Sequence, residues 1–141
     1  MQLTKIPEEA VTLILKNDNI VMVGSVNSKG EPNISPRFVL SVVEDDKLLF
    51  ADAFSTKTFD NIQAWNKVTV AIIDKETMGG FQLKGDAGEV KDEELVAQAN
   101  SKLREAGLGT DAQRAWVVSV KEVYSLKPDR RSKAPMSSAY G

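Results

Sequence analysis

Apolar residues along this chain gather in stretches that have the composition of β-strands. They are rich in Val, Ile, Leu and Phe, and turn residues such as Asn, Asp and Gly separate them. The six stretches are residues 20–26, 32–43, 47–53, 67–74, 81–90 and 115–126. Asn27-Ser-Lys-Gly30 is typical of a hairpin turn in which Gly30 takes a positive φ. Pro32 and Pro36 restrict the second stretch to an edge or a bulge. The nearly continuous Val and Ile of the fourth indicate burial on both faces.

Three further segments have the spacing of helices. They cover residues 7–16, 55–65 and 92–106. In the second segment Phe59, Ile62 and Trp65 share one face, so we expect Trp65 in the core. Asp92 is placed to cap the third helix, and Gly107 is placed to end it.

The order of these elements is helix, three strands, helix, two strands, helix, strand. Strands joined as hairpins, with helices between them, predict a mainly β protein of the α+β class. Its expected form is a six-stranded antiparallel barrel with peripheral helices. A chain of 141 residues suits one domain, which we place at residues 1–128. Residues 129–141 are rich in Ser, Arg, Lys and Pro, and we expect a tail that is mobile or orders on a partner surface.

Two absences from the composition narrow the chemistry. The chain has no cysteine and no histidine, which excludes disulfides, iron–sulfur clusters, thiol catalysis, Ser-His-Asp hydrolysis and nearly all zinc sites. We therefore expect no metal, and redox chemistry would need an organic cofactor. A net charge of −2 and the lack of long apolar runs predict a cytoplasmic protein with neither nucleic acid nor membrane as partner.

The strongest candidate for a binding site is Ser55-Thr-Lys57-Thr58, between a strand end and a helix start. Unpaired N–H groups at a helix N-terminus form an anion site, which the helix dipole strengthens. Hydroxyls and one ammonium converge there, as a terminal phosphate requires. The alternative is an ordinary N-cap beside a solvated lysine. Asp52 would disfavour a phosphate, and we expect it to point away.

Two other segments have a weaker claim to a ligand. Arg37 follows Pro36 on an edge-type strand, where a guanidinium can make a forked contact to a phosphate or a ring carbonyl. Gly79 and Gly80 permit the backbone to approach a flat ligand closely. The alternatives are an outward charge and a flexible hairpin loop. Trp116 is suited either to stacking on a flat ring or to an interface.

Several segments, taken in order, resemble one family. They are the strand-to-helix run 47–62 with its Ser-x-Lys, the corner Asn66-Lys-Val68, the strand 81–87 ending in Gly-Asp-Ala, and the closing strand 123–128. This set is similar to the pyridoxamine-5'-phosphate-oxidase-like FMN-binding split β-barrel proteins. Lys67 stands where proline is usual in that family. The resemblance covers residues 7 to 128.

The resemblance implies FMN bound at the interface of a homodimer. Ser55, Lys57 and Thr58 would hold the phosphate, and the backbones of Asp52 and Ala53 would offer further groups. Strand residues would line the ring and the ribityl chain, namely Ser35, Pro36, Arg37 and Phe38. The second subunit would supply Gly79, Gly80 and Gln82, and Trp116 as well.

The resemblance also sets the expected function. The family's oxidases carry an Arg- and His-containing substrate segment near the C-terminus. Here that end is Pro128-Asp-Arg-Arg-Ser-Lys-Ala-Pro, which has no histidine, so we do not expect that activity. We expect an FMN-dependent oxidoreductase or electron carrier, served by a small-molecule or redox-protein electron donor. The alternatives are a reductase that uses the deazaflavin F420, a flavin storage module without turnover, and a ligand-free structural dimer. Tyr124, Lys84 and Arg37 are the candidate proton donors.

Overall fold

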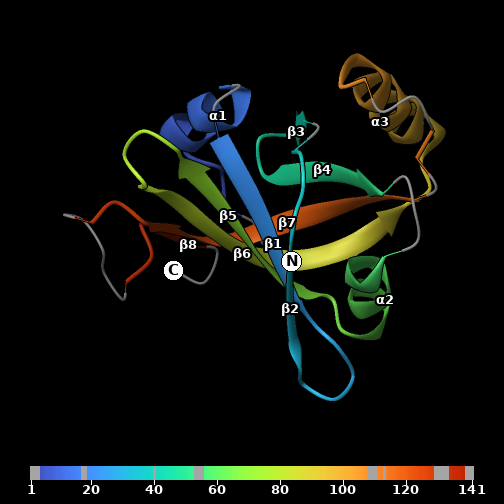
Figure 1. Cartoon of the computed structure of the whole chain (residues 1–141), viewed down its shortest axis with the longest axis horizontal. Coiled ribbons are helices and arrows are strands. Elements are labelled where there is room, and N and C mark those ends of the chain that lie inside the picture. Colours follow the sequence, from blue (N-terminus) through green and yellow to red (C-terminus); the bar gives the residue numbers. More distant parts are fainter. Residues whose placement is uncertain are drawn as a thin grey trace.

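The computed structural model describes residues 4–16, 19–39, 41–52, 56–107, 111–112, 114–128 and 134–138. Its three helices are α1 (Glu8–Leu15), α2 (Lys57–Ala64) and α3 (Glu93–Glu105). Its strands are β1 (Asn19–Val26), β2 (Pro32–Pro36), β3 (Ser41–Val43), β4 (Lys47–Asp52), β5 (Lys67–Asp74), β6 (Gly80–Val90), β7 (Arg114–Ser125) and β8 (Ser137–Ser138). The expected α+β class with a mainly antiparallel sheet is confirmed (Figure 1).

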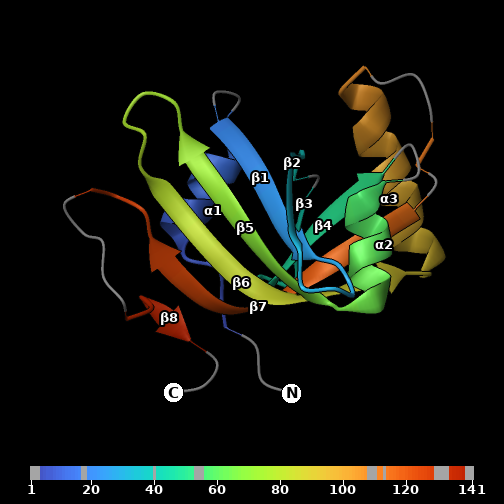
Figure 2. The same ribbon diagram turned by 60° about the horizontal axis from the view of Figure 1, so that its bottom comes forward.

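The described strands form one sheet in the order β2-β1-β5-β6-β7-β4-β3, with β8 paired to β7. All pairs are antiparallel. The prediction of six strands is wrong, because the stretch 32–43 divides into β2 and β3 and the tail adds β8. β2 and β3 are the two edge strands of this order. Pro36 ends β2 and Ser41 begins β3, so their Cα atoms lie at most about 18 Å apart and the sheet must curl to bring its two edges near each other (Figure 2). No ladder joins β2 to β3 among the described residues, so the sheet does not close.

The core lies inside this curl. Its largest fully buried side chain is Trp116, which stacks on Phe50 with ring centroids 4.4 Å apart and an interplanar angle of 12°. The exposed fraction of Trp116 is 0%, whereas that of Trp65 is 52%. The expectation that Trp65 belongs to the core is therefore wrong. It follows the last helical residue of α2 with extended backbone (φ −150°), so helical spacing does not decide where it points.

The helices pack in the places that their apolar faces dictate. α1 and α2 contribute Ala10, Leu13, Phe59 and Ile62 to the main core, from opposite ends of the sheet (Figure 1). Buried Ala99 of α3 joins a second cluster on the other face of β4 and β7. No helix in the described ranges is both long and apolar enough to cross a lipid bilayer.

The residues that the sequence places at helix ends and in the hairpin turn adopt the expected conformations. The Asp92 carboxylate caps α3 by accepting from the backbone N–H groups of Glu94 and Leu95. Gly107 follows α3 with φ +78°, and Gly30 turns the β1–β2 hairpin with φ +79°. Both glycine predictions are confirmed. α2 begins at Lys57 with Thr56 as its N-cap; the expected start at Ser55 lies outside the described residues.

Part of the predicted tail joins the sheet of its own chain. Ser137 and Ser138 pair with Val123 and Glu122 of β7, and the Met136 N–H donates to the Val123 carbonyl at 2.7 Å. The basic residues 129–133 lie outside the described ranges. This part of the tail is therefore a strand partner of β7 in the same chain.

The ladder between β6 and β7 shifts register at Lys84 and Gly85. A Cβ at Gly85 would lie 2.1 Å from the Ser119 carbonyl oxygen, so we expect Gly85→Ala to lower the free energy of unfolding by about 1–3 kcal/mol through overpacking. Gly88→Ala is the matched control, since a Cβ there meets nothing within 4 Å, and its effect should stay within about 0.5 kcal/mol. Urea unfolding followed by circular dichroism compares the two. Equal effects would show that the close approach at Gly85 relaxes freely.

Candidate functional site

A polar network fills the end of the curled sheet that α2 covers. The Arg37 Nε–H donates to Asp52 Oδ1 at 2.9 Å, and the Thr56 hydroxyl donates to Asp52 Oδ2 at 2.9 Å. Thr56 Oγ1 in turn accepts from the Phe59 N–H at 3.2 Å as the N-cap of α2. Asp52 is only 4% exposed. The prediction that it points away is therefore wrong, because β4 directs Leu48, Phe50 and Asp52 to the same inner face.

Two further side-chain hydrogen bonds tie α2 to the sheet. Ser35 and Thr58 are 3.0 Å apart, oxygen to oxygen, and Thr58 is 1% exposed. The buried Asn61 amide donates to the Ser25 hydroxyl at 3.0 Å. These contacts satisfy polar groups that would be costly to bury alone. They fix the N-terminal part of α2, from Thr58 to Asn61, against β1 and β2.

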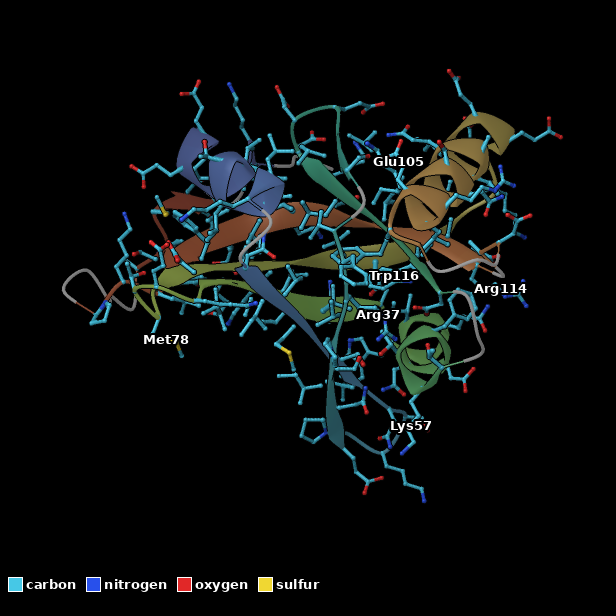
Figure 3. All side chains as sticks on the ribbon, turned by 45° about the horizontal axis from the view of Figure 1, so that its top comes forward. Arg37, Lys57, Met78, Glu105, Arg114 and Trp116 are labelled. Atoms are coloured by element: carbon cyan, nitrogen blue, oxygen red, sulfur yellow. The ribbon has the colours of Figure 1, made fainter. Side chains whose placement is uncertain are left out.

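Three basic side chains surround this helix start, and two of them are in ion pairs: Arg37 with Asp52, and Arg114 with Glu89 at 3.5 Å. Lys57 is exposed, and no hydrogen bond or ion pair joins it to another described residue. Arg114 faces Asp52 across the β4–β7 ladder, and its guanidinium lies 5.2 Å from the centre of the Phe59 ring. Arg37, Lys57 and Arg114 all lie near α2 (Figure 3). This end of the curled sheet has the groups that an anion requires: cations and the N-terminus of a helix.

Arg37 retains binding capacity despite its partners. Its Nε–H is taken by Asp52, and Nη1 donates to the Pro36 carbonyl at 2.8 Å. A guanidinium has five N–H donors, so three of them have no partner among the described residues. The side chain is 15% exposed. Arg37 is thus held in place while still able to donate.

The other predicted residues occupy different places. Phe38 is 63% exposed, beside the exposed Pro36. Ala53 and Ser55 lie outside the described residues. Trp116 has no exposed surface left for a flat ring, because it stacks on Phe50 inside the core. We therefore no longer assign Trp116 to the cofactor site.

The Gly79–Gln82 segment is far from this cluster. It follows the β5–β6 turn, and Met78 lies at the end of the sheet opposite Lys57 (Figure 3). Gly80 has a role within the chain, since a Cβ there would lie 1.9 Å from the Ile72 carbonyl oxygen. The hairpin therefore requires this glycine whether or not a ligand binds.

A groove with a volume of about 670 Å³ runs over the sheet. Its described lining has none of the predicted cofactor-binding residues, but it includes Lys84, a candidate proton donor. Its apolar part includes Gly24, Val26 and Ile34. Its polar part includes Asp86, which accepts from Lys67 at 2.6 Å and also from Lys121, an ammonium-bearing side chain only 8% exposed. Burial raises the pKa of the Asp86 carboxyl, but the hydrogen bonds from Lys121 and Lys67 outweigh it and hold the pKa below its usual range.

Tyr124 lies on the outer face beside this groove. Its hydroxyl donates to Glu122 at 2.9 Å, and the Lys84 ammonium lies 5.3 Å from the centre of its ring. The hydrogen bond to Glu122, together with burial, raises the pKa of Tyr124. Tyr124 and Lys84, the two candidate proton donors on β6 and β7, are therefore neighbours, while Arg37 belongs to the α2 cluster.

The sequence profile of the pyridoxamine 5'-phosphate oxidase family matches residues 6–131. The chain belongs to this family. Solved structures with the same fold include HupZ from Group A Streptococcus, with 23% identity and a TM-score of 0.77, covering 90% of this chain and 98% of that one. An FMN-binding protein from Syntrophomonas wolfei has 18% identity and a TM-score of 0.76, covering 84% of each chain.

An F420 reductase also has the fold, with 15% identity and a TM-score of 0.66, covering 84% of this chain and 98% of that one. A search of curated proteins finds no match. Identities this low establish a common fold alone. The match to the pyridoxamine 5'-phosphate oxidase family fixes the family and leaves the cofactor and the reaction open.

Sequence reasoning missed two features of this family member. The first is the inward Asp52 with Thr56 as its partner, which strand alternation from Leu48 and Phe50 could have indicated. The second is the Lys121–Asp86 pair. Lys121 lies at the register shift between β6 and β7, and no sequence pattern reveals where a bulge turns a side chain.

Proposed function

We propose that this chain is an FMN-binding flavoprotein that acts as an oxidoreductase or electron carrier. The observation that carries the proposal is the cluster of Arg37 and Lys57 at the start of α2, in a family with an FMN-binding structural neighbour. A phosphate monoester needs charge-assisted donors in a fixed arrangement. Lys57, the first turn of α2 and the remaining donors of Arg37 suit that group.

The residues of this chain would bind and orient the cofactor. Lys57 and the backbone N–H groups of α2 would hold the phosphate. The segment from Ser35 to Phe38 would lie along the ribityl chain and the ring. A bound flavin supplies the electron or hydride transfer. Tyr124, held by Glu122, is a candidate proton donor on the other side of the sheet.

We further propose a homodimer with the cofactor at its interface. Met78, in the β5–β6 turn, lies at the opposite end of the sheet from Lys57 (Figure 3). Gly79, Gly80 and Gln82 directly follow it in the chain, so a second copy would be needed to bring them to the same ligand. Exposed Ile34 and Phe38, at 67% and 63%, and the open strand edges are typical of surfaces that association covers. Sedimentation of the full chain tests this: a monomer at all concentrations would contradict it.

The direct test of the proposed function is a visible absorbance spectrum after the purified protein is mixed with FMN and freed of unbound ligand. A retained flavin band supports the proposal, and photoreduction then tests whether the bound flavin accepts electrons. Retention of F420 in place of FMN would favour the deazaflavin reductase. Failure to retain either would overturn the proposal and leave a structural dimer.

The Lys57 ammonium is expected to contribute strongly to FMN affinity. Lys57→Ala should weaken binding by about 1–3 kcal/mol, roughly 5- to 150-fold in Kd, because a charge-assisted contact to the phosphate is lost. Quenching of flavin fluorescence measures the affinity. Lys16→Ala removes an equal charge from the C-terminus of α1, at the other end of the sheet, and should leave Kd unchanged. Unchanged affinity in Lys57→Ala would place the phosphate elsewhere.

A further inference from the structure

The buried carboxylate of Asp52 connects three elements through its two oxygens. Oδ1 accepts from Arg37, which follows β2, and Oδ2 accepts from Thr56, which caps α2; both distances are 2.9 Å. Asp52 itself ends β4. Since its side chain is only 2% exposed, solvent cannot replace these contacts. One group thus fixes both an arginine and a helix N-terminus.

The position of this carboxylate contradicts simple charge matching. A phosphate held by Lys57 and α2 would lie near Asp52, and like charges at short range repel. Asp52 also cancels the positive charge of Arg37, with which it forms an ion pair. If electrostatics alone decided the affinity, the site would bind a phosphate more tightly without Asp52. A carboxylate at this position is explained if it fixes the direction of the neighbouring hydrogen-bond donors.

We propose that Asp52 is a positioning residue for the phosphate end of the cofactor. It fixes the Arg37 guanidinium through Nε, so that the unpaired N–H donors keep one direction. It also fixes the first turn of α2 through Thr56, whose Oγ1 accepts from the Phe59 N–H at 3.2 Å. Donors fixed before binding lose less conformational entropy when the ligand arrives. This inference rests on the proposed FMN site and deepens it.

Positioning and simple repulsion predict opposite effects of one substitution on the affinity for FMN. If Asp52 positions the donors, Asp52→Ala weakens FMN binding at least about tenfold, although a negative charge has been removed. If Asp52 only repels, the same variant binds FMN more tightly. Asp52→Asn should fall between the wild type and Asp52→Ala, because an amide oxygen accepts from one of the two donors but its nitrogen cannot accept from the other.

Riboflavin, which lacks the phosphate, separates positioning from general loss of structure. We expect Asp52→Ala to change the affinity for riboflavin less than about threefold. The Kd for riboflavin divided by the Kd for FMN should therefore fall in this variant. Thr56→Val should reproduce the loss for FMN, and Thr56→Ser, which keeps the hydroxyl, should restore it. Circular dichroism spectra and unfolding curves of all variants confirm that folded protein is compared.

The experiment titrates the full-length wild type and the four variants with FMN and riboflavin by fluorescence quenching. A loss selective for FMN, rescued by Thr56→Ser, supports the inference. Equal losses for both ligands, or tighter FMN binding by Asp52→Ala, overturn it while leaving the FMN site intact. No FMN binding by the wild type would overturn the proposed function, and with it this inference.

Discussion

Trp116→Ala should lower the free energy of unfolding by about 3–5 kcal/mol, the usual cost of truncating a buried aromatic residue to alanine. The ring is fully buried and stacks on Phe50 at 4.4 Å. Removing it deletes both the stacking contact and the largest fully buried side chain, and the curled sheet around it cannot collapse onto the space without bending strands. The measurement is urea unfolding followed by far-UV circular dichroism.

Two variants make this prediction specific. Trp65→Ala removes the same side chain from a position that is 52% exposed, and its cost should stay below about 1 kcal/mol. Trp116→Phe keeps an aromatic ring on Phe50 and deletes the indole N–H, which has no hydrogen-bond partner among the described residues. Losing an unsatisfied donor offsets part of the lost volume. Similar losses for Trp116→Ala and Trp65→Ala would contradict the assignment of the core.

The two tryptophans also show what sequence periodicity can and cannot decide. Trp65 fits the helical spacing of Phe59 and Ile62, but α2 ends at Ala64 and the next residue is extended. A helix end cannot be located to one residue from its pattern alone. Trp116 follows strand alternation with Val118 and Val120, yet Ala115 beside it is buried as well, under α3. Burial on both faces of a strand removes the alternation that would have identified the inner face.

The number of strands depended on contacts between distant residues. The apolar stretch 32–43 has strand character throughout, so the pattern predicts a single strand. In the structure β2 pairs with β1 and β3 pairs with β4, at opposite ends of the sheet. The break between them is needed because the sheet curls. β8 consists of two serines that pair with β7, and such a short, polar segment has no strand signal of its own.

The basic residues of the candidate site could be identified from the sequence, but the direction of its acidic residue could not. Lys57 was singled out by its place at a helix start, and Arg37 by its place on an edge strand after Pro36. Asp52 was expected outside because a carboxylate beside a phosphate is unfavourable. In the structure the carboxylate is paired with Arg37 and Thr56 before any ligand is considered. Local charge reasoning fails where a hydrogen-bonded network determines side-chain direction.

Asp86→Ala should lower the free energy of unfolding at neutral pH by about 3 kcal/mol, the scale for a buried ion pair that loses one partner. The carboxylate is 13% exposed and contacts Lys121, whose side chain is 8% exposed. Without Asp86, the Lys121 ammonium loses its carboxylate in a place with little access to water. Lys67→Ala is the matched control. It removes a lysine that contacts the same carboxylate but is 57% exposed, and surface pairs of this kind contribute less than about 1 kcal/mol.

The pH dependence of the difference in unfolding free energy between wild type and Asp86→Ala distinguishes the loss of an ion pair from the loss of packing. Burial opposes ionisation of Asp86, but the hydrogen bonds from Lys121 and Lys67 lower its pKa in the folded state. A carboxyl whose pKa is lower when folded stabilises the protein above its unfolded pKa of about 3.9 and loses that contribution as pH falls through the folded value. The gap between wild type and Asp86→Ala should therefore be constant from pH 7 to about 5 and shrink below about 4. A gap that persists at acidic pH would mean that Asp86 stabilises this part of the sheet by packing, because protonation removes the charge and leaves the shape of the side chain unchanged.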